Sequence, residues 1–158
     1  MKDYLEEIAV TGGSKKLIGG QVLDLEGEGK KLTKKDLVKT HEAKTAALLT
    51  CAVRLGAMTA NATPRKLEAL TTFGYNLGLA FQVIDDILDV TQTTEMLGKT
   101  AGKDEAVDKS TYPAILGLDA SRKEAARLTV KALKSLEIFG KKGKRLEQIA
   151  RYLLEREY

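Results

Sequence analysis

The sequence of 158 residues has no tryptophan, one cysteine and two prolines, and only 5% of its residues are aromatic. The single cysteine, Cys51, cannot form an internal disulfide, which disfavours a small disulfide-stabilised secreted domain. No apolar run approaches the roughly 20 residues that a membrane-spanning helix needs. The acidic, amphipathic start does not have the features of a signal peptide. These absences predict a cytoplasmic protein without stable membrane insertion.

Basic residues are in excess, with 26 lysines and arginines against 22 acidic residues and a net charge of +4. Such a charge suits a polyanionic partner, either nucleic acid or a diphosphate, and it is equally typical of a solvated basic surface. The lysines are not interleaved with aromatic residues, so a stacking platform for single-stranded nucleic acid is not expected. We therefore predict no nucleic-acid partner.

The hydrophobic pattern predicts an all-α protein. No segment alternates at period two, so no sheet is expected, and no linker or repeat divides the chain. A weaker helical signal lies at 17–25 within a glycine-rich segment, and a polar loop is expected at 91–109. The other predicted helices cover residues 4–9, 34–59, 64 to about 90, 113–118, 121–140 and 144–155.

Capping signals place the ends of some of these helices. Thr33 followed by Asp36, and Ser121 followed by Glu124, have the spacing of capping boxes at helix starts. Gly140 is a natural residue to end the helix that would begin at Ser121, because glycine tolerates the left-handed backbone that follows a helix.

A lysine occupies an apolar face of the helix predicted for residues 34–59. At about 100° per residue, Lys44 lies within roughly 20° of Leu37, Leu48 and Leu55, while Thr45 lies at the edge of this stripe. A buried lysine costs several kcal/mol unless an anion pairs with it. Either an anion binds there, or the side chain extends to the rim of the core. The whole stripe consists of Leu37, Leu48, Cys51, Ala52 and Leu55.

Carboxylates interrupt the apolar face of the next predicted helix, in GLAFQVIDDILD. Asp85 shares a face with Gly74 and Gly78, Asp89 lies close to it, and Asp86 lies at its flank. Three like charges within one turn repel one another unless a divalent cation such as Mg²⁺ binds them. The alternative is an acidic turn that faces solvent. The two glycines leave room for another helix or a flat ligand.

The segment that follows, LGKTAGKDEAVDKSTYP, carries lysines between glycines. Lys99, Lys103 and Lys109 next to a metal-binding cluster suggest a ligand that contains phosphate. GKTAGKD is not a Walker A loop, because the spacing of its glycines is short by one residue and Asp104 replaces the required serine or threonine.

Five motifs in order, GGQVLDL, HEAKT, GLAFQVIDDILD, LGKTAGKD and KSTYP, resemble those of the trans-isoprenyl diphosphate synthases. This family includes the farnesyl and geranylgeranyl diphosphate synthases. The resemblance extends from about Gly19 to the C-terminal YLLEREY. It implies the all-α isoprenoid synthase fold, in which helices surround a deep central cavity.

The resemblance also implies roles for individual residues. Magnesium and an allylic diphosphate would be held by Asp85, Asp86 and Asp89. The remaining implied residues are Lys44, Thr45, Lys99 and Lys109 on the diphosphate, Gln82 near the leaving group, Asp104 as a supporting partner, and Gln21 and Asp24 in a more structural role. Of these, Lys44, Gln82 and Lys99 are the expected catalytic residues.

The implied reaction is electrophilic alkylation of isopentenyl diphosphate by the cation that an allylic diphosphate leaves behind. Members of the family are considerably longer and carry a first aspartate-rich motif upstream of the GQ segment, and no such motif precedes Gln21 here. We therefore interpret residues 1–158 as the C-terminal portion of a polyprenyl synthase domain, which would pair with its missing half or form a homodimer.

Three other functions are compatible with parts of the sequence. A non-catalytic regulatory subunit of a heteromeric prenyl synthase would account for the missing motif. A terpene cyclase is disfavoured by GKTAGKD followed by KSTYP. A basic helical nucleic-acid-binding module would leave the inward-facing aspartates unexplained.

Overall fold

The computed structural model describes residues 2–97 and 110–154, with the side chains of 92–97 left out. Throughout these residues the regular structure is helical and no strand occurs, which confirms the all-α prediction. The elements are α1 (Lys2–Gly12), α2 (Leu17–Gly27), α3 (Lys34–His41), the π-helical segment η1 (Glu42–Ala46), α4 (Ala47–Thr59), α5 (Pro64–Leu97), α6 (Tyr112–Leu116), α7 (Leu118–Ser135), the 3₁₀ segment η2 (Glu137–Gly143) and α8 (Lys144–Leu154).

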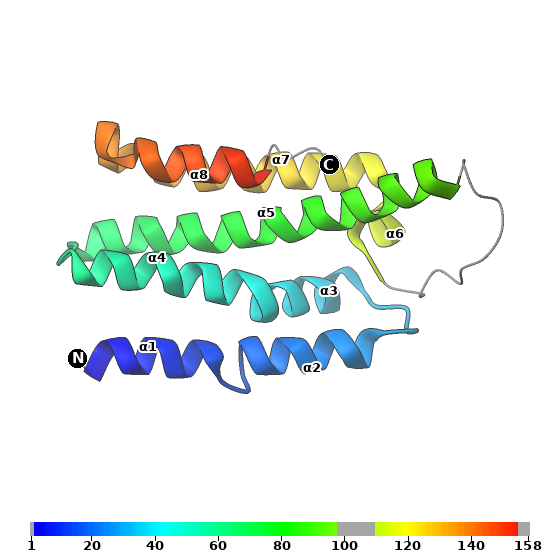
Figure 1. Cartoon of the computed structure of the whole chain (residues 1–158), viewed down its shortest axis with the longest axis horizontal. Helices are drawn as coiled ribbons and strands as arrows, with labels where there is room; N and C mark the ends of the chain where they lie inside the picture. Colours follow the sequence, from blue (N-terminus) through cyan, green and yellow to red (C-terminus); the bar gives the residue numbers. More distant parts are fainter. Residues whose placement is uncertain (1, 98–109, 155–158) are drawn as a thin grey trace.

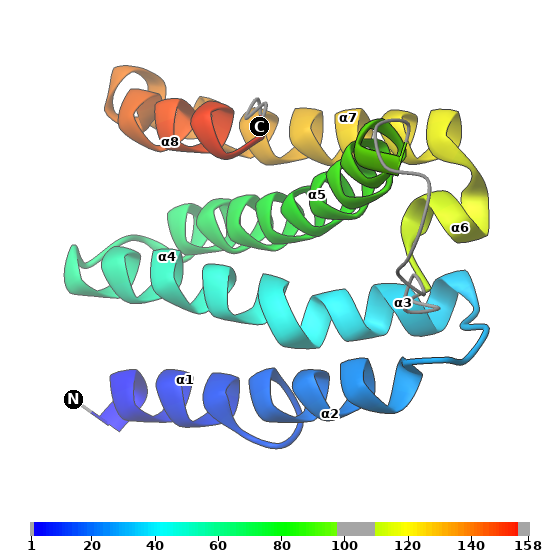
Figure 2. The ribbon, with the colours of Figure 1, turned by 45° about the vertical axis from the view of Figure 1, so that its right-hand side comes forward.

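The helices lie side by side in layers (Figures 1 and 2). Helices α1 and α2 follow one another along one edge, and the continuous run of α3, η1 and α4 packs against them. The long α5 comes next and makes its most extensive contacts with α4 and α7. Helix α8 packs beside α7 at the opposite edge (Figure 2). In the part of the chain that the structure describes, no helix is long and apolar enough to cross a bilayer.

Helix positions agree with the sequence pattern better than helix ends do. The weak signal at 17–25 corresponds to a full helix, α2. Helix α5 continues to Leu97, so the start of the predicted loop at 91–109 is wrong. The reason is local, because neither glycine nor proline interrupts residues 91–97 before Gly98.

The predicted capping box at the start of α3 is confirmed. The Thr33 Oγ1 accepts a hydrogen bond from the amide of Asp36 at 3.2 Å, and the Asp36 carboxylate accepts one from the amide of Thr33 at 3.4 Å. The side-chain hydrogen bond from Thr33 lowers the pKa of the Asp36 carboxyl. This reciprocal pair satisfies two backbone donors and fixes where the chain enters α3.

The second predicted capping box is wrong. Helix α7 begins at Leu118, directly after Gly117, whose φ of 82° reverses the chain direction. Ser121 lies one turn inside the helix, where its Oγ donates to the Gly117 carbonyl at 2.9 Å. A serine hydroxyl can donate to a carbonyl of the preceding helical turn, or it can accept from a backbone amide as a helix cap. The sequence alone does not distinguish these two positions. Gly140 lies within η2 and does not end α7, which stops at Ser135.

Burial along α3, η1 and α4 differs from the predicted stripe. Leu37 and Cys51 are buried as expected, but Leu48 is 50% exposed and Ala52 is exposed, and Ala46 and Ala57 are buried instead. The π-helical segment η1 adds a residue to one turn, so the helix after it is rotated relative to a uniform 100° pattern. The predicted face therefore fails at this point.

Two glycines let α5 approach its neighbours closely. A Cβ atom on Gly74 would lie 2.7 Å from the Cα of Thr50, and one on Gly78 would lie 2.5 Å from the Cα of Ala46. These positions confirm that the glycines admit another helix. The approach brings η1 directly against the part of α5 that carries the aspartates.

Candidate functional site

A connected chain of polar side chains joins α2, η1 and α5. The Lys44 ammonium donates to the carboxylate of Asp24 in a partly buried ion pair. Thr45 Oγ1 donates to Gln82 Oε1 at 3.0 Å, and Gln82 Nε2 donates to Asp85 Oδ2 at 3.3 Å. Three segments far apart in the sequence thus place five predicted site residues in one region.

Segment η1 is the centre of this arrangement. Lys44 bonds to α2 and Thr45 bonds to α5, so two consecutive side chains connect opposite neighbours. Gly20 permits the first contact, because a Cβ there would lie 2.3 Å from the Lys44 amide nitrogen. Sequence reasoning missed this role, although the paired glycines of GGQVLDL were the available signal. π-helical turns within helices frequently occur at functional sites.

The three aspartates of α5 do not gather into one cluster. Asp85 is partly buried and Asp89, one turn further on, is exposed. Asp86 is 6% exposed, and its Oδ2 accepts a hydrogen bond from the Tyr112 amide at 2.9 Å. Among the described residues no three His, Cys, Asp or Glu side chains are grouped so as to hold a metal ion. Consecutive helical residues diverge by about 100°, so Asp86 is directed away from the face of Asp85.

The remaining predicted residues are placed as follows. Gln21 is exposed on α2. Lys99, Asp104 and Lys109 lie outside the described residues.

Burial raises the pKa of Tyr112 from its usual value of 10 to about 12, and the nearby carboxylates of Glu124 and Asp86 add to the effect. Between these values the unfolded chain loses this proton and the folded chain keeps it. We therefore expect the free energy of unfolding to fall as the pH rises from about 10 to 12. Tyr112→Phe should flatten this decline, whereas Phe at Tyr152, which is 79% exposed, should not. Urea unfolding at a series of alkaline pH values measures both slopes.

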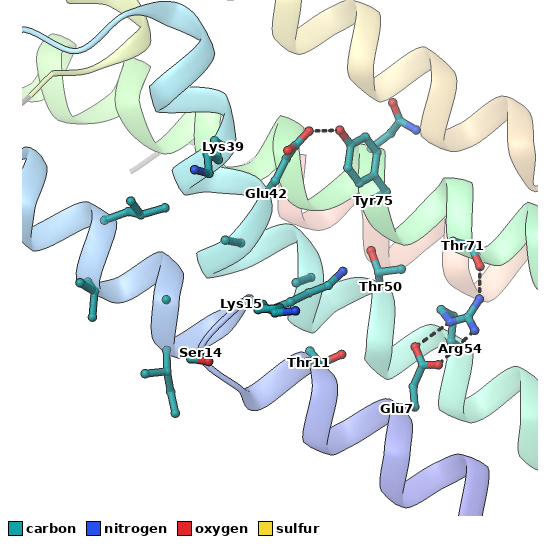
Figure 3. A pocket seen from close by; sticks show the side chains of 18 of the residues that line it. Glu7, Thr11, Ser14, Lys15, Lys39, Glu42, Thr50, Arg54, Thr71 and Tyr75 are labelled. Atoms are coloured by element: carbon teal, nitrogen blue, oxygen red, sulfur yellow. Dashed lines mark hydrogen bonds and ion pairs between the residues drawn. The ribbon is translucent and has the colours of Figure 1, made fainter.

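A cavity beside η1 is lined by residues that do not include Lys44, Thr45 or Asp85. It has a volume of about 1170 Å³ and is lined by α1, α2, α3, η1, α4 and α5 and by Ser14, Lys15 and Lys16 between α1 and α2 (Figure 3). The Tyr75 hydroxyl donates to the Glu42 carboxylate at its edge. Burial and this neighbouring carboxylate raise the pKa of Tyr75 to about 12.

Arg54 of α4 forms hydrogen bonds to side chains of both α1 and α5 in this cavity (Figure 3). Its guanidinium donates to both carboxylate oxygens of Glu7, at 2.7 and 3.0 Å, and to the Thr71 hydroxyl at 2.8 Å. We expect Arg54→Ala to destabilise the chain by about 1–3 kcal/mol, because charged hydrogen bonds are lost from a partly buried position. The matched control is Arg127→Ala, which removes an exposed bidentate pair with Glu124 and should cost less than about 1 kcal/mol. Equal losses in urea unfolding would contradict the structural role of Arg54.

The sequence matches a family model described as polyprenyl synthetase over residues 7–153. The chain is 43% identical over 156 residues to farnesyl diphosphate synthase of Escherichia coli, covering 96% of this chain and 52% of that protein. It is 44% identical over 153 residues to a chloroplastic geranylgeranyl pyrophosphate synthase of Capsicum annuum, covering 96% of this chain and 42% of that one.

Solved structures agree with these matches. A putative farnesyl-diphosphate synthase from Marinomonas sp. MED121 superposes with a TM-score of 0.83 at 33% identity, covering 96% of this chain and 51% of that one. The Helicobacter pylori geranyltransferase, complexed with magnesium and isoprenyl diphosphate, gives 0.74 at 32% identity, covering 97% and 50%.

The fold of these neighbours confirms the predicted isoprenoid synthase fold. The chain spans about half the length of the curated relatives and solved structures that it matches. The family model nevertheless covers nearly all of its residues, including every described residue of the polar chain from Asp24 to Asp85. This protein chain therefore belongs to the polyprenyl synthetase family.

Proposed function

We propose that this chain supplies the allylic-diphosphate site of a trans-prenyltransferase that joins isopentenyl diphosphate to an allylic diphosphate. The observation that carries the proposal is the pair of hydrogen bonds that links Thr45 to Gln82 and Gln82 to Asp85, with the Lys44–Asp24 ion pair on the adjacent residue of η1. Relatives named farnesyl and geranylgeranyl diphosphate synthases support this substrate class.

The donor set suits magnesium. Asp85 and Asp89 stand one turn apart on α5 and offer hard carboxylate oxygens. Magnesium is usually held by one or two carboxylates together with substrate phosphates and water, so two ligands on one helix are sufficient. When bound, the ion supplies Lewis-acid stabilisation of the departing diphosphate.

The protein residues hold and orient the leaving group. The ion pair with Asp24 keeps the Lys44 ammonium at the site, where it can attract diphosphate oxygens. Gln82 keeps the Asp85 carboxylate in place, and Thr45 in turn holds Gln82. Donors and charges fixed before the reaction stabilise a developing anion without reorganising.

In the proposed reaction the carbon–oxygen bond of the allylic diphosphate breaks, and its electron pair leaves with the diphosphate. The double bond of isopentenyl diphosphate then forms a carbon–carbon bond to the allylic cation. Loss of a proton to the departing diphosphate restores a double bond. Lys99 and Lys109 are proposed to contact the same diphosphate, and Asp104 to support them.

Exposed hydrophobic side chains on α1 and α2 support the expected pairing with a second copy or with the part of the relatives that this chain does not match. Six large hydrophobic side chains on these two helices are each about half exposed, and Ile18, Val22 and Leu25 recur at a spacing that places them on one face of α2. They are Leu5, Ile8, Val10, Ile18, Val22 and Leu25.

Calorimetric titration with inorganic pyrophosphate tests the proposed site. We expect binding that requires Mg²⁺ and that weakens at least about tenfold, or roughly 1.4 kcal/mol, in Lys44→Ala. Lys131→Ala on α7, outside these contacts, is the control. Pyrophosphate binding that is equally strong without Mg²⁺ and in Lys44→Ala would overturn the proposal.

The 158 residues by themselves are expected to bind diphosphate without catalysing prenyl transfer. They contain one aspartate-rich motif, so charge on the leaving group would be neutralised from one side only. The measurement is an assay with Mg²⁺, isopentenyl diphosphate and an allylic diphosphate, with the purity of the chain checked by mass spectrometry. Repeated turnover by this chain alone would contradict the expectation.

A further inference from the structure

A buried cluster lies directly behind the proposed site. It consists of His41 from α3, Asp86 from α5 and Tyr112 from α6, which are 5%, 6% and 1% exposed. The rings of His41 and Tyr112 stack, with centroids 5.6 Å apart and planes inclined by 26°. Asp86 Oδ2 lies 3.9 Å from His41 Nε2 and accepts the Tyr112 amide hydrogen at 2.9 Å.

The orientation of Asp86 differs from that of its neighbours in the motif. Its described contacts are with the protein interior, whereas Asp85 contacts Gln82 and Asp89 is exposed. A carboxylate that shares a magnesium ion with a substrate phosphate must present oxygen toward that substrate. Asp86 is buried, and its Oδ2 faces the start of α6.

The cluster lies between the two segments that carry the proposed site. His41 immediately precedes η1, which carries Lys44 and Thr45. Asp86 immediately follows Asp85 in α5. The contact between His41 and Asp86 therefore lies close to the hydrogen bond from Thr45 to Gln82. Both contacts join the same two segments, so a shift of η1 along α5 would disturb both.

The third member, Tyr112, connects this cluster to the rest of the fold. It begins α6, whose preceding residue Thr111 caps the helix by accepting from the Ala114 amide at 3.3 Å. Ser110 is held in turn by the chain between α2 and α3, donating to the Lys30 carbonyl at 2.7 Å and accepting from the Leu32 amide at 3.1 Å. The start of α6 is thus fixed on both sides.

We propose that Asp86 is a positioning residue and not a magnesium ligand, and that with His41 and Tyr112 it sets the register between η1 and α5. The inference rests on the proposed function for the identity of the ligand. The contact of Asp86 with Tyr112 can be tested without that function.

Four substitutions separate the two roles, all made in the full chain, and one of them is His41→Ala. Asp86→Asn keeps a carbonyl oxygen that can accept from the Tyr112 amide but removes the charge. Asp86→Ala removes both, and Asp85→Asn removes the charge of the proposed ligand next to it. Two quantities are measured for each variant: the exchange rate of the Tyr112 amide by NMR, and the Mg²⁺ concentration that half-saturates binding of inorganic pyrophosphate.

We expect Asp86→Ala to speed exchange of the Tyr112 amide at least about tenfold, because a buried hydrogen bond is lost. In Asp86→Asn the Tyr112 amide should still exchange slowly, and the half-saturating Mg²⁺ concentration should stay within about twofold of that of the unsubstituted chain. Asp85→Asn should raise that concentration about tenfold or more. His41→Ala should weaken pyrophosphate binding without changing the Mg²⁺ requirement, since it disturbs position and removes no ligand.

Two results would overturn the proposal. One is an increase in the Mg²⁺ requirement for Asp86→Asn as large as that for Asp85→Asn, which would make Asp86 a ligand. The other is unchanged exchange of the Tyr112 amide in Asp86→Ala, which would remove the anchor. If the original chain does not bind pyrophosphate, the proposed function fails, and amide exchange alone then decides whether Asp86 holds α6.

Discussion

Replacing Asp85 with asparagine should lower the rate of prenyl transfer by about a thousandfold or more while leaving the fold intact. Asparagine keeps an oxygen that can accept from Gln82 Nε2, so the local hydrogen bond survives. What is lost is the negative charge that the proposed magnesium site requires. Because Asp85 is partly exposed, the substitution leaves no cavity in the core.

The assay needs a complete active site. A suitable enzyme joins this chain to the part of the Escherichia coli farnesyl diphosphate synthase that it does not match. Asp119→Asn, at an exposed position in the first turn of α7, is the control and should leave the rate unchanged. Thermal unfolding of each variant separates lost chemistry from lost structure. A decrease of less than about tenfold, or roughly 1.4 kcal/mol, would mean that Asp85 is not a principal ligand.

The helices could be predicted because an apolar face repeats every 3.6 residues over long segments. The prediction failed where the chain departs from that period. In η1 an extra residue in one turn rotates α4, so Leu48 is exposed where a uniform wheel buries it. No residue type in Glu42–Ala46 marks a π-helical turn, since the turn depends on what packs against it.

Part of the site could also be predicted, because charged residues on apolar faces are costly and therefore informative. That argument selected Lys44 and Asp85. In the structure Asp85 bonds to Gln82, which bonds to Thr45, and Lys44 is the residue before Thr45 in η1. The ion-pair partner of Lys44 could not be derived in the same way. Asp24 reaches it only because Gly20 lets α2 approach η1, and that separation is a property of the packed helices.

The direction in which each aspartate side chain points could not be predicted from the sequence, for a related reason. The spacing of Asp85, Asp86 and Asp89 suggests one cluster within a helical turn. The buried amide of Tyr112, which lies 26 positions further along the chain, draws Asp86 to the other side of α5. Only the tertiary fold brings that donor close, so local spacing overestimates the number of carboxylates that face a ligand.

The glycine contacts lead to the second large effect. Gly78→Ala should destabilise the chain by about 3 kcal/mol, or on the order of 10 °C in the unfolding midpoint. The new Cβ would lie 2.5 Å from the Cα and 2.9 Å from the Cβ of Ala46, closer than real Cβ contacts. Both atoms belong to or adjoin the backbone of η1, so no side-chain rotation relieves the overlap, and α5 must move away.

Gly56→Ala is the matched control, since Gly56 also lies within a helix and a Cβ there meets nothing within 4 Å. Alanine should stabilise the chain at that position by about 0.5–1 kcal/mol, so the two substitutions should change the free energy of unfolding in opposite directions.

The proposed site should also be affected by Gly78→Ala. Thr45 precedes Ala46, and its 3.0 Å bond to Gln82 cannot persist if η1 separates from α5. Gly78→Ala is therefore expected to weaken Mg²⁺-dependent pyrophosphate binding below the unfolding temperature, and Gly56→Ala to leave it unchanged. Stabilisation by Gly78→Ala would mean that the approach of α5 to η1 is looser than the structure shows.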